Sequence, residues 1–258
     1  MAEAISDAAV VAVLRPFARA ARPVLGGLRD ADPFGLRARM RGVSPGSADE
    51  RGLREKVLDL LASVKVPGTA AWAAMDVEAR CRWWIYRVGR FTTVIAAVPG
   101  LGGAVANKLP VSDTMAAAGQ GLLLCAIAGE HGITDEETLV ALLAAVLFRR
   151  DLTPRALSPA DDAAVAAQAA ELTGDLADTR STVTPRRVAA AVWRLGRALF
   201  ACSDELDKRP HGRFYHGAVQ LLPVVGVAGR YFGEWSGLKR ASKEAHRWLA
   251  ARWATHLG

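Results

Sequence analysis

The chain has 258 residues, a length that fits one large domain or two small ones. Hydrophobic residues make up 51% of it and aromatic residues 7%, so the apolar content is mostly Ala, Val and Leu, which suits close helix packing. The net charge of +7 favours acidic partners, namely anionic lipid, nucleic acid or an acidic protein face. Three distant cysteines, Cys81, Cys125 and Cys202, argue against a disulfide framework and a Cys-x-x-Cys zinc site.

The first predicted element is a helix over about 7–28. Arg15, Arg19 and Arg22 are spaced four and three residues apart, which places them on one face opposite an apolar stripe. No acidic residue occurs from 8 to 29. We therefore predict a basic amphipathic helix whose arginines contact a membrane or a partner.

Residues 30–47 carry proline, glycine and arginine and are typical of a linker. The capping box Ser47-Ala-Asp-Glu50 then opens a helix that ends near Pro67. We accordingly divide the chain into a basic N-terminal segment and linker at 1–47 and a helical domain at 48–258. The acidic N-terminal stretch lacks the basic start of a signal peptide, which predicts a cytoplasmic protein.

The rest of the chain also reads as helices. They are expected at about 72–98, 113–129, 135–149, 159–173, 185–203 and 237–256. The N-cap signals are Ser112, Thr134, Ser158 and Thr184, and Gly132 ends the helix at 113–129. No stretch alternates apolar and polar residues as a half-buried strand would. The predicted fold is therefore all-α.

A short apolar phrase split by one proline occurs at 94–106 and again at 217–229. In each, a glycine follows the proline by three residues: Pro99 with Gly102, and Pro223 with Gly226. Proline breaks or kinks a helix and glycine allows close approach, while neither run reaches the roughly 18–20 apolar residues of a membrane span. These phrases predict two apolar helical hairpins, side by side in a pseudo-repeat, that contact a membrane or a partner.

The last predicted helix has two different faces. Arg240, Lys243 and Arg247 lie on one face, and Trp248 and Trp253 lie on another with leucine and alanine. Cations opposite tryptophans are typical of a helix at a membrane interface. The alternative is that the tryptophan face packs on the protein core.

Motifs of chemistry are missing from the sequence. The glycines at 100–103 and Asn107-Lys108 do not have the Gly-Lys-Ser/Thr order of a phosphate-binding loop. The five histidines are scattered at His131, His211, His216, His246 and His256. We therefore expect no catalytic residue, cofactor or metal, although an unrecognised hydrolase site stays open.

Three segments carry a resemblance to a known family. Residues 89–100 (GRFTTVIAAVPG), then Leu109-Pro-Val-Ser-Asp113, then a Leu-rich helix ending at 127–134 resemble the central region of EcsC-family proteins. Residues 221–226 and the basic helix after them are similar to the family's C-terminal part, with Arg230-Tyr231 where the family usually has an asparagine. The resemblance covers about 70–250 and extends to the related helical domain fused to bacterial GTPases. It implies a cytoplasmic, membrane-associated helical protein without established catalytic residues.

Two functions of different classes follow. The first is a non-enzymatic peripheral protein at the inner face of the cell membrane, which binds anionic lipid or a membrane protein through its hairpins and basic helices. The second is a soluble helical module that binds an acidic protein or nucleic acid through its Arg-rich N-terminus. Nucleic acid is disfavoured because aromatic residues are not interleaved with the basic run 15–41. Assembly into a homo-oligomer stays open.

Overall fold

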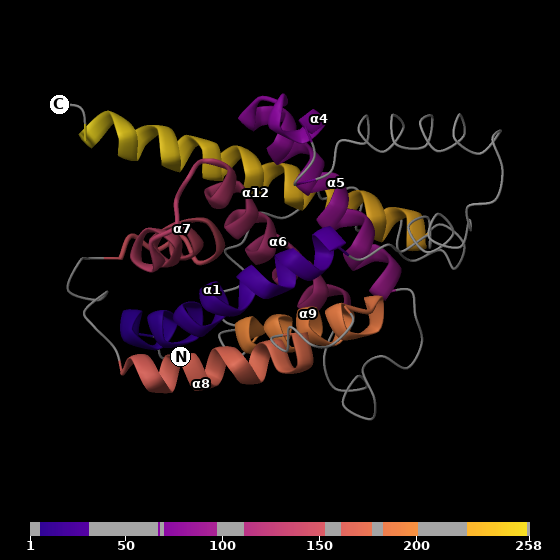
Figure 1. Ribbon diagram of the computed structural model, residues 1–258, viewed down its shortest axis with the longest axis horizontal. Coiled ribbons are helices and arrows are strands. Elements are labelled where there is room, and N and C mark those ends of the chain that lie inside the picture. The colour runs from indigo at the N-terminus through magenta and orange to yellow at the C-terminus, as the bar shows by residue number, and fades with distance from the viewer. Residues whose placement is uncertain are drawn as a thin grey trace, which may run out of the picture.

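Helices make up the regular structure of this chain. The computed structural model describes residues 6–30, 67, 70–96, 111–152, 161–176, 183–200 and 226–256. No strand occurs in these ranges, which confirms the predicted all-α fold (Figure 1). The elements in chain order are α1 (Asp7–Asp30), α4 (Ala70–Ala73), α5 (Val77–Ala96), α6 (Val111–Glu130), α7 (Glu136–Leu147), α8 (Asp162–Thr173), the 3-10 turn η2 (Gly174–Leu176), α9 (Pro185–Phe200) and α12 (Gly226–His256).

Helix α6 lies at the centre of the molecule, and every residue from 117 to 128 is buried. It contacts α1, α5, α7, α9 and α12. Between Asp113 and Glu130 it has no charged residue. A helix that is apolar on nearly all sides is stable when other helices surround it, which is how α6 is placed here.

Two glycines allow α6 to approach its neighbours closely. A Cβ atom on Gly121 of α6 would meet the Phe17 ring of α1 at 2.5 Å. A Cβ atom on Gly196 of α9 would collide with the backbone oxygen of Thr114 in α6. Larger residues at these positions would push the helices apart, so the small side chains set the spacing of the core.

Helix α1 is part of the same core. Leu14 and Phe17 are fully buried in it, and the helix continues through Pro16 and Pro23. It packs against α6, α7, α8 and α9. Its residues therefore pack into the same core as the later helices. The predicted linker and the helix after Ser47 lie outside the described residues.

Several helix starts differ from the predictions. The expected helix at 72–98 is divided into α4 and α5, because Asp76 accepts a hydrogen bond from the Ala79 backbone N–H at 2.6 Å and caps α5. The N-cap of α7 is Asp135 instead of Thr134, and that of α8 is Asp161 instead of Ser158. In each case a carboxylate in the right backbone position makes the capping bonds.

Other predicted boundaries are confirmed. Thr184 accepts a hydrogen bond from the Arg187 backbone N–H, and Pro185 is the first residue of α9. Gly132 follows α6 with a φ of +78°, a left-handed conformation that glycine adopts without strain. Helix α12 begins at Gly226 instead of near 237, so this part of the second Pro/Gly phrase is helical.

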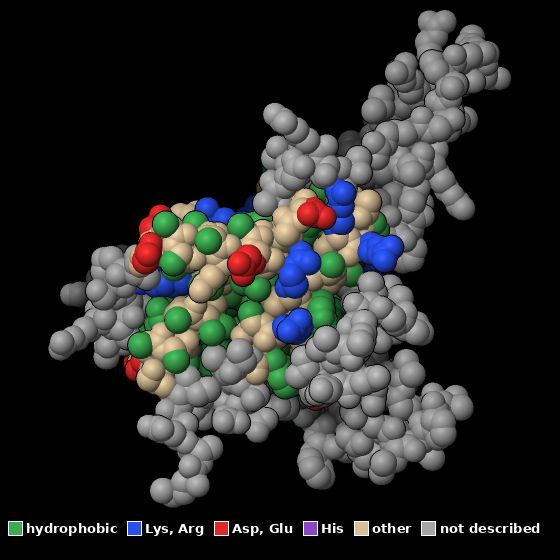
Figure 2. Space-filling model, turned by 90° about the horizontal axis from the view of Figure 1, so that it is seen from below, with side chains coloured by type: hydrophobic (Ala, Val, Ile, Leu, Met, Phe, Trp, Pro, Cys, Tyr) green, Lys and Arg blue, Asp and Glu red, His purple; other side chains and the backbone are tan. Residues whose placement is uncertain are grey.

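The helices are arranged in layers. In Figure 1, α8 and α9 lie along the lower side, α12 along the upper side, and α6 between them, while α5 runs down the right side. Figure 2 shows the lower face, where acidic side chains lie toward the left and centre and most basic ones toward the right. Exposed alanines of α8 lie on this face as well. Its mixed charge gives it no large field of a single sign.

Candidate functional site

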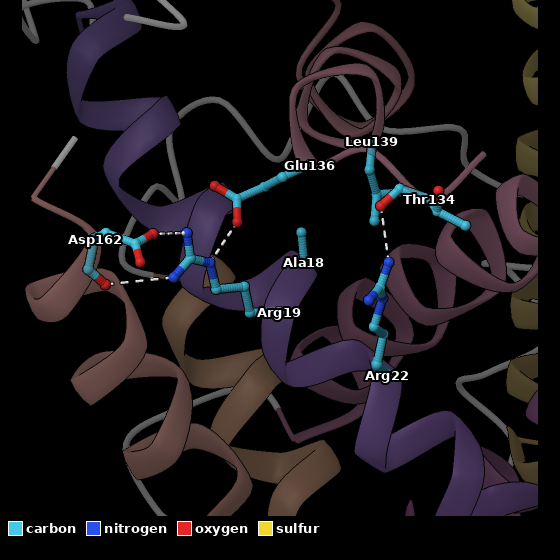
Figure 3. Close-up of a pocket in the computed structure, with 7 residues that line it drawn as sticks. All are labelled: Ala18, Arg19, Arg22, Thr134, Glu136, Leu139 and Asp162. Carbon is cyan, nitrogen blue, oxygen red and sulfur yellow. Dashed lines mark hydrogen bonds and ion pairs between the residues drawn. The ribbon is translucent and has the colours of Figure 1, made fainter. Parts of the chain in front are cut away.

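A pocket of about 460 Å³ lies between α1, α7 and α8. Figure 3 shows the seven residues that line it: Ala18, Arg19, Arg22, Thr134, Glu136, Leu139 and Asp162. The Arg19 guanidinium donates hydrogen bonds to the carboxylates of Glu136 and Asp162, and also to the Asp162 backbone oxygen at 3.3 Å. These hydrogen bonds raise the pKa of Arg19 above its ordinary value. The positive charge of Arg19 is therefore paired with the negative charges of Glu136 and Asp162 in the wall of this pocket.

The other two arginines of this face also bond to other parts of the protein, although Arg22 is exposed. Arg15 is 7% exposed, and its Nη1 atom lies 3.3 Å from Glu136 Oε1. Arg22 donates from Nη2 to the backbone oxygen of Thr134 at 2.7 Å. We expected Arg15, Arg19 and Arg22 to contact a membrane or a partner. In the structure they join α1 to α7 and α8, and their contact with a membrane or a partner stays a prediction.

The basic face of α12 has a different position. Arg240, Lys243 and Arg247 are all exposed. Lys239, also exposed, lies over the Trp235 ring with its Nζ atom 5.7 Å from the ring centroid. Arg240, Lys243 and Arg247 are spaced three and four residues apart, which places them on one side of the helix. The structure thus brings these predicted contact residues together on an outer surface.

The two tryptophans near the end of α12 differ from each other. Trp248 is half-buried and packs against the core, with the Arg252 guanidinium 5.3 Å from its ring centroid. This placement agrees with the alternative that the tryptophan face packs inward. Trp253 is 44% exposed, and its ring lies 5.3 Å from the His131 ring. Trp253 is therefore the one of the pair that can reach a partner.

A cluster that the sequence analysis missed lies where α5, α6 and α12 meet. Cys81 of α5, His131 after α6 and His246 of α12 place a sulfur and two ring nitrogens within 4.8 Å of one another. His131 Nε2 and His246 Nδ1 are 3.2 Å apart, which is a hydrogen-bond distance. Cys81 is 1% exposed, and both histidines are half-buried.

Burial controls the ionisation of this cluster. It raises the pKa of the Cys81 thiol to about 12, and the Glu130 carboxylate acts in the same direction. Burial also lowers the pKa of both histidines, and the charge of His246 lowers the pKa of His131 further. At neutral pH the three groups are therefore a thiol and two neutral imidazoles.

A carboxylate in a fixed position lies beside the cluster. Glu130 pairs with Arg80 at 3.1 Å and accepts a hydrogen bond from Trp84 Nε1 at 2.9 Å. Trp84 is 6% exposed and packs edge-on against Trp83. These contacts fix the side chain of Glu130, the residue that directly precedes His131, and they join the end of α6 to α5.

The apolar hairpins cannot be placed in the same way. Pro99, Gly102 and Pro223 lie outside the described residues, and Gly226 is the first residue of α12. The predicted pseudo-repeat therefore stays a prediction. Within the described ranges, no helix combines the length and hydropathy needed to cross a bilayer.

Comparisons of the chain with protein-family models, with curated proteins and with solved structures found no match. The resemblance to the EcsC family therefore stays a prediction.

Proposed function

We propose that this protein is a non-enzymatic peripheral protein that binds anionic membrane surfaces through the outer face of α12. The observation that carries the proposal is the exposure of Arg240, Lys243 and Arg247 on one side of this helix. Each cation close to an anionic membrane contributes about 1 kcal/mol to binding. Three together give a reversible electrostatic attachment.

Acidic residues are rare in the part of α12 that carries these cations. From Lys239 to Arg252 the sequence has one acid, Glu244. Its carboxylate lies 2.7 Å from the Arg149 guanidinium at the end of α7. Glu244 is therefore engaged in joining α12 to α7.

Trp253 supports a membrane over an acidic protein as the partner. A tryptophan that is 44% exposed at the end of a basic helix can enter the headgroup region, where its ring is partly apolar and partly polar. The same proposal includes a cytoplasmic position at the inner face of the cell membrane, where anionic lipid lies. The resemblance to the EcsC family points in this direction.

The alternative module, which binds an acidic protein or nucleic acid through an Arg-rich N-terminus, has less support. Arg15 and Arg19 are paired with acids of α7 and α8, and Arg22, although exposed, donates to the Thr134 backbone oxygen. We therefore give the surface of α12 priority over the N-terminal helix.

Flotation on phosphatidylcholine vesicles, with and without phosphatidylglycerol, tests the proposal. We expect binding to the anionic vesicles alone, and a decrease as sodium chloride is raised, because salt screens exposed charges. Changing Arg240, Lys243 and Arg247 together to Glu should weaken binding by at least about 100-fold, since about 1 kcal/mol is lost per cation and the three carboxylates add repulsion.

The matched control changes three exposed arginines elsewhere, Arg90, Arg186 and Arg197, to Glu. It alters the net charge by the same amount and should retain most of the binding. Circular dichroism confirms that both variants are folded. Equal flotation on neutral and anionic vesicles, or an equal loss in the two variants, would exclude α12 as the membrane contact.

A further inference from the structure

We propose that Cys81, His131 and His246 form a binding site for one zinc ion. The three side chains come from different parts of the chain and converge at the junction of α5, α6 and α12. Their sulfur and nitrogen atoms all lie within 4.8 Å of one another. This inference does not depend on the membrane proposal, because it concerns the inner side of α12.

The geometry fits the size of a tetrahedral zinc site. Zinc binds a cysteine sulfur at about 2.3 Å and a histidine nitrogen at about 2.0–2.1 Å, so neighbouring ligand atoms lie about 3.3–3.6 Å apart. His131 Nε2 and His246 Nδ1 are already 3.2 Å apart. The Cys81 sulfur starts within 4.8 Å of both, so a small inward movement completes the set.

The chemistry of the donor set also fits zinc. One sulfur and two imidazole nitrogens suit a metal of intermediate softness, and a set of three leaves a fourth position for water. Binding breaks the S–H bond of Cys81, forms an S–Zn bond and releases one proton to solvent. The two histidines give up their mutual hydrogen bond. The ring nitrogen that donated it loses its proton to solvent while the other nitrogen of the same ring takes one up, so both rings stay neutral and coordinate through the two nitrogens that had shared the bond.

The surroundings offset the resulting charge. Zinc with one thiolate has a net charge of +1, and Glu130 acts on Cys81 electrostatically while Glu78 acts on both Cys81 and His246. Glu130 is held in place by Arg80 and Trp84. Fixed carboxylates around the ligands are a common second layer of zinc sites.

A metal can reach this cluster from solvent. His131 and His246 are half-buried, while Cys81 is 1% exposed beneath them. The ring of Trp253 lies beside His131. Once bound, zinc would join α12 to α5 and to the end of α6, and this link would add to the packing of Leu238, Ala241 and Ala245, which are buried.

Titration of the chelator-treated full-length protein with Co²⁺, a spectroscopic substitute for zinc, tests the site. We expect one equivalent of Co²⁺ to produce a thiolate-to-cobalt charge-transfer band and the visible bands of tetrahedral cobalt. Zinc should then displace cobalt and abolish both signals. Zinc should also raise the melting temperature, because a ligand that binds the native state stabilises it.

Cys81→Ser should remove the charge-transfer band, and His246→Gln should lower the affinity for zinc at least tenfold. The matched control is Cys125→Ser, which changes another buried cysteine of a neighbouring helix and should keep the band. Because a core substitution can lower stability by itself, the melting temperature is compared with and without zinc within each variant. Absence of a thiolate–cobalt band in the wild type, or the same zinc-induced shift in Cys81→Ser, would refute the site.

Discussion

Helices α1 and α12 both have a face of regularly spaced cations, yet these faces have opposite positions in the structure. In α1, Arg15 is 7% exposed and Arg19 donates to two carboxylates on other helices. In α12, Lys243 and Arg247 are exposed. A basic stripe in a sequence therefore indicates either a surface for an acidic partner or an internal contact with acidic residues elsewhere in the chain.

The difference comes from residues far away in the sequence. Glu136 is 117 residues after Arg19, and Asp162 is 143 residues after it. Both lie in the first turns of their helices, where an acid is favoured by the helix dipole in any case. Nothing in the local pattern of 7–28 shows that these acids come to meet the arginines.

The largest effect on stability should follow from Glu136→Gln. This change removes the carboxylate shared by Arg15 and Arg19, and so removes the ion pair between Glu136 and the mostly buried Arg15. Breaking a partly buried pair costs about 2–3 kcal/mol of unfolding free energy. Denaturant unfolding measures it.

Glu137→Gln is the matched control for that change, because Glu137 is an exposed acid in the same first turn. It should cost about 0.3–1 kcal/mol through the helix dipole alone. Equal losses for the two variants would mean that the α1 arginines contribute nothing to stability through pairing with Glu136.

Lowering the pH should weaken the contact between His131 and His246 of α12 before it weakens the ion pairs of α1. Burial lowers the pKa of His131 and His246 from the ordinary 6.5. A lowered histidine pKa gives stability that is complete above about pH 6.5 and is lost as the pH falls toward the folded-state value. The arginines of α1 stay charged throughout.

The measurement is the unfolding free energy between pH 7.5 and about pH 5, compared with His246→Gln. The variant should have a smaller decrease over this range, even if it is less stable at every pH. An identical pH dependence in the two proteins would show that the His131–His246 contact does not control stability.

Neutralising one arginine on α12 and one on α1 compares the two basic faces directly. Arg247→Gln should weaken binding to anionic vesicles about fivefold, which corresponds to about 1 kcal/mol. Arg22→Gln should leave this binding unchanged, because Arg22 donates to the Thr134 backbone oxygen. Vesicle sedimentation at low salt measures both, and a comparable loss for Arg22→Gln would place α1 at the membrane.

Much of the fold could be predicted because its signals are local. Thr184 with Pro185, and Gly132 after α6, mark helix ends within a few residues of sequence. The caps of α7 and α8 were placed incorrectly because several capping residues are adjacent there, and local sequence does not decide between them.

The candidate sites could be predicted much less well. His131 and His246 are 115 residues apart, and neither they nor Cys81 belong to a spacing motif. Their proximity depends on how α5, α6 and α12 pack, which is a property of the whole core. An inward-facing histidine in the basic helix α12 was the one available signal.

The smallest expected effect concerns Trp253, an exposed tryptophan at the end of α12, whereas α1 contains no tryptophan. Trp253→Ala should change the unfolding free energy by about 0.5 kcal/mol or less, since the side chain is 44% exposed. It should also reduce the part of vesicle binding that persists at high salt, because an aromatic ring in the headgroup region acts through apolar contact. Tyr86→Ala is the control, as Tyr86 is 43% exposed on α5. If the two variants lose the same salt-resistant binding, Trp253 has no particular role and the contact of α12 with lipid is electrostatic alone.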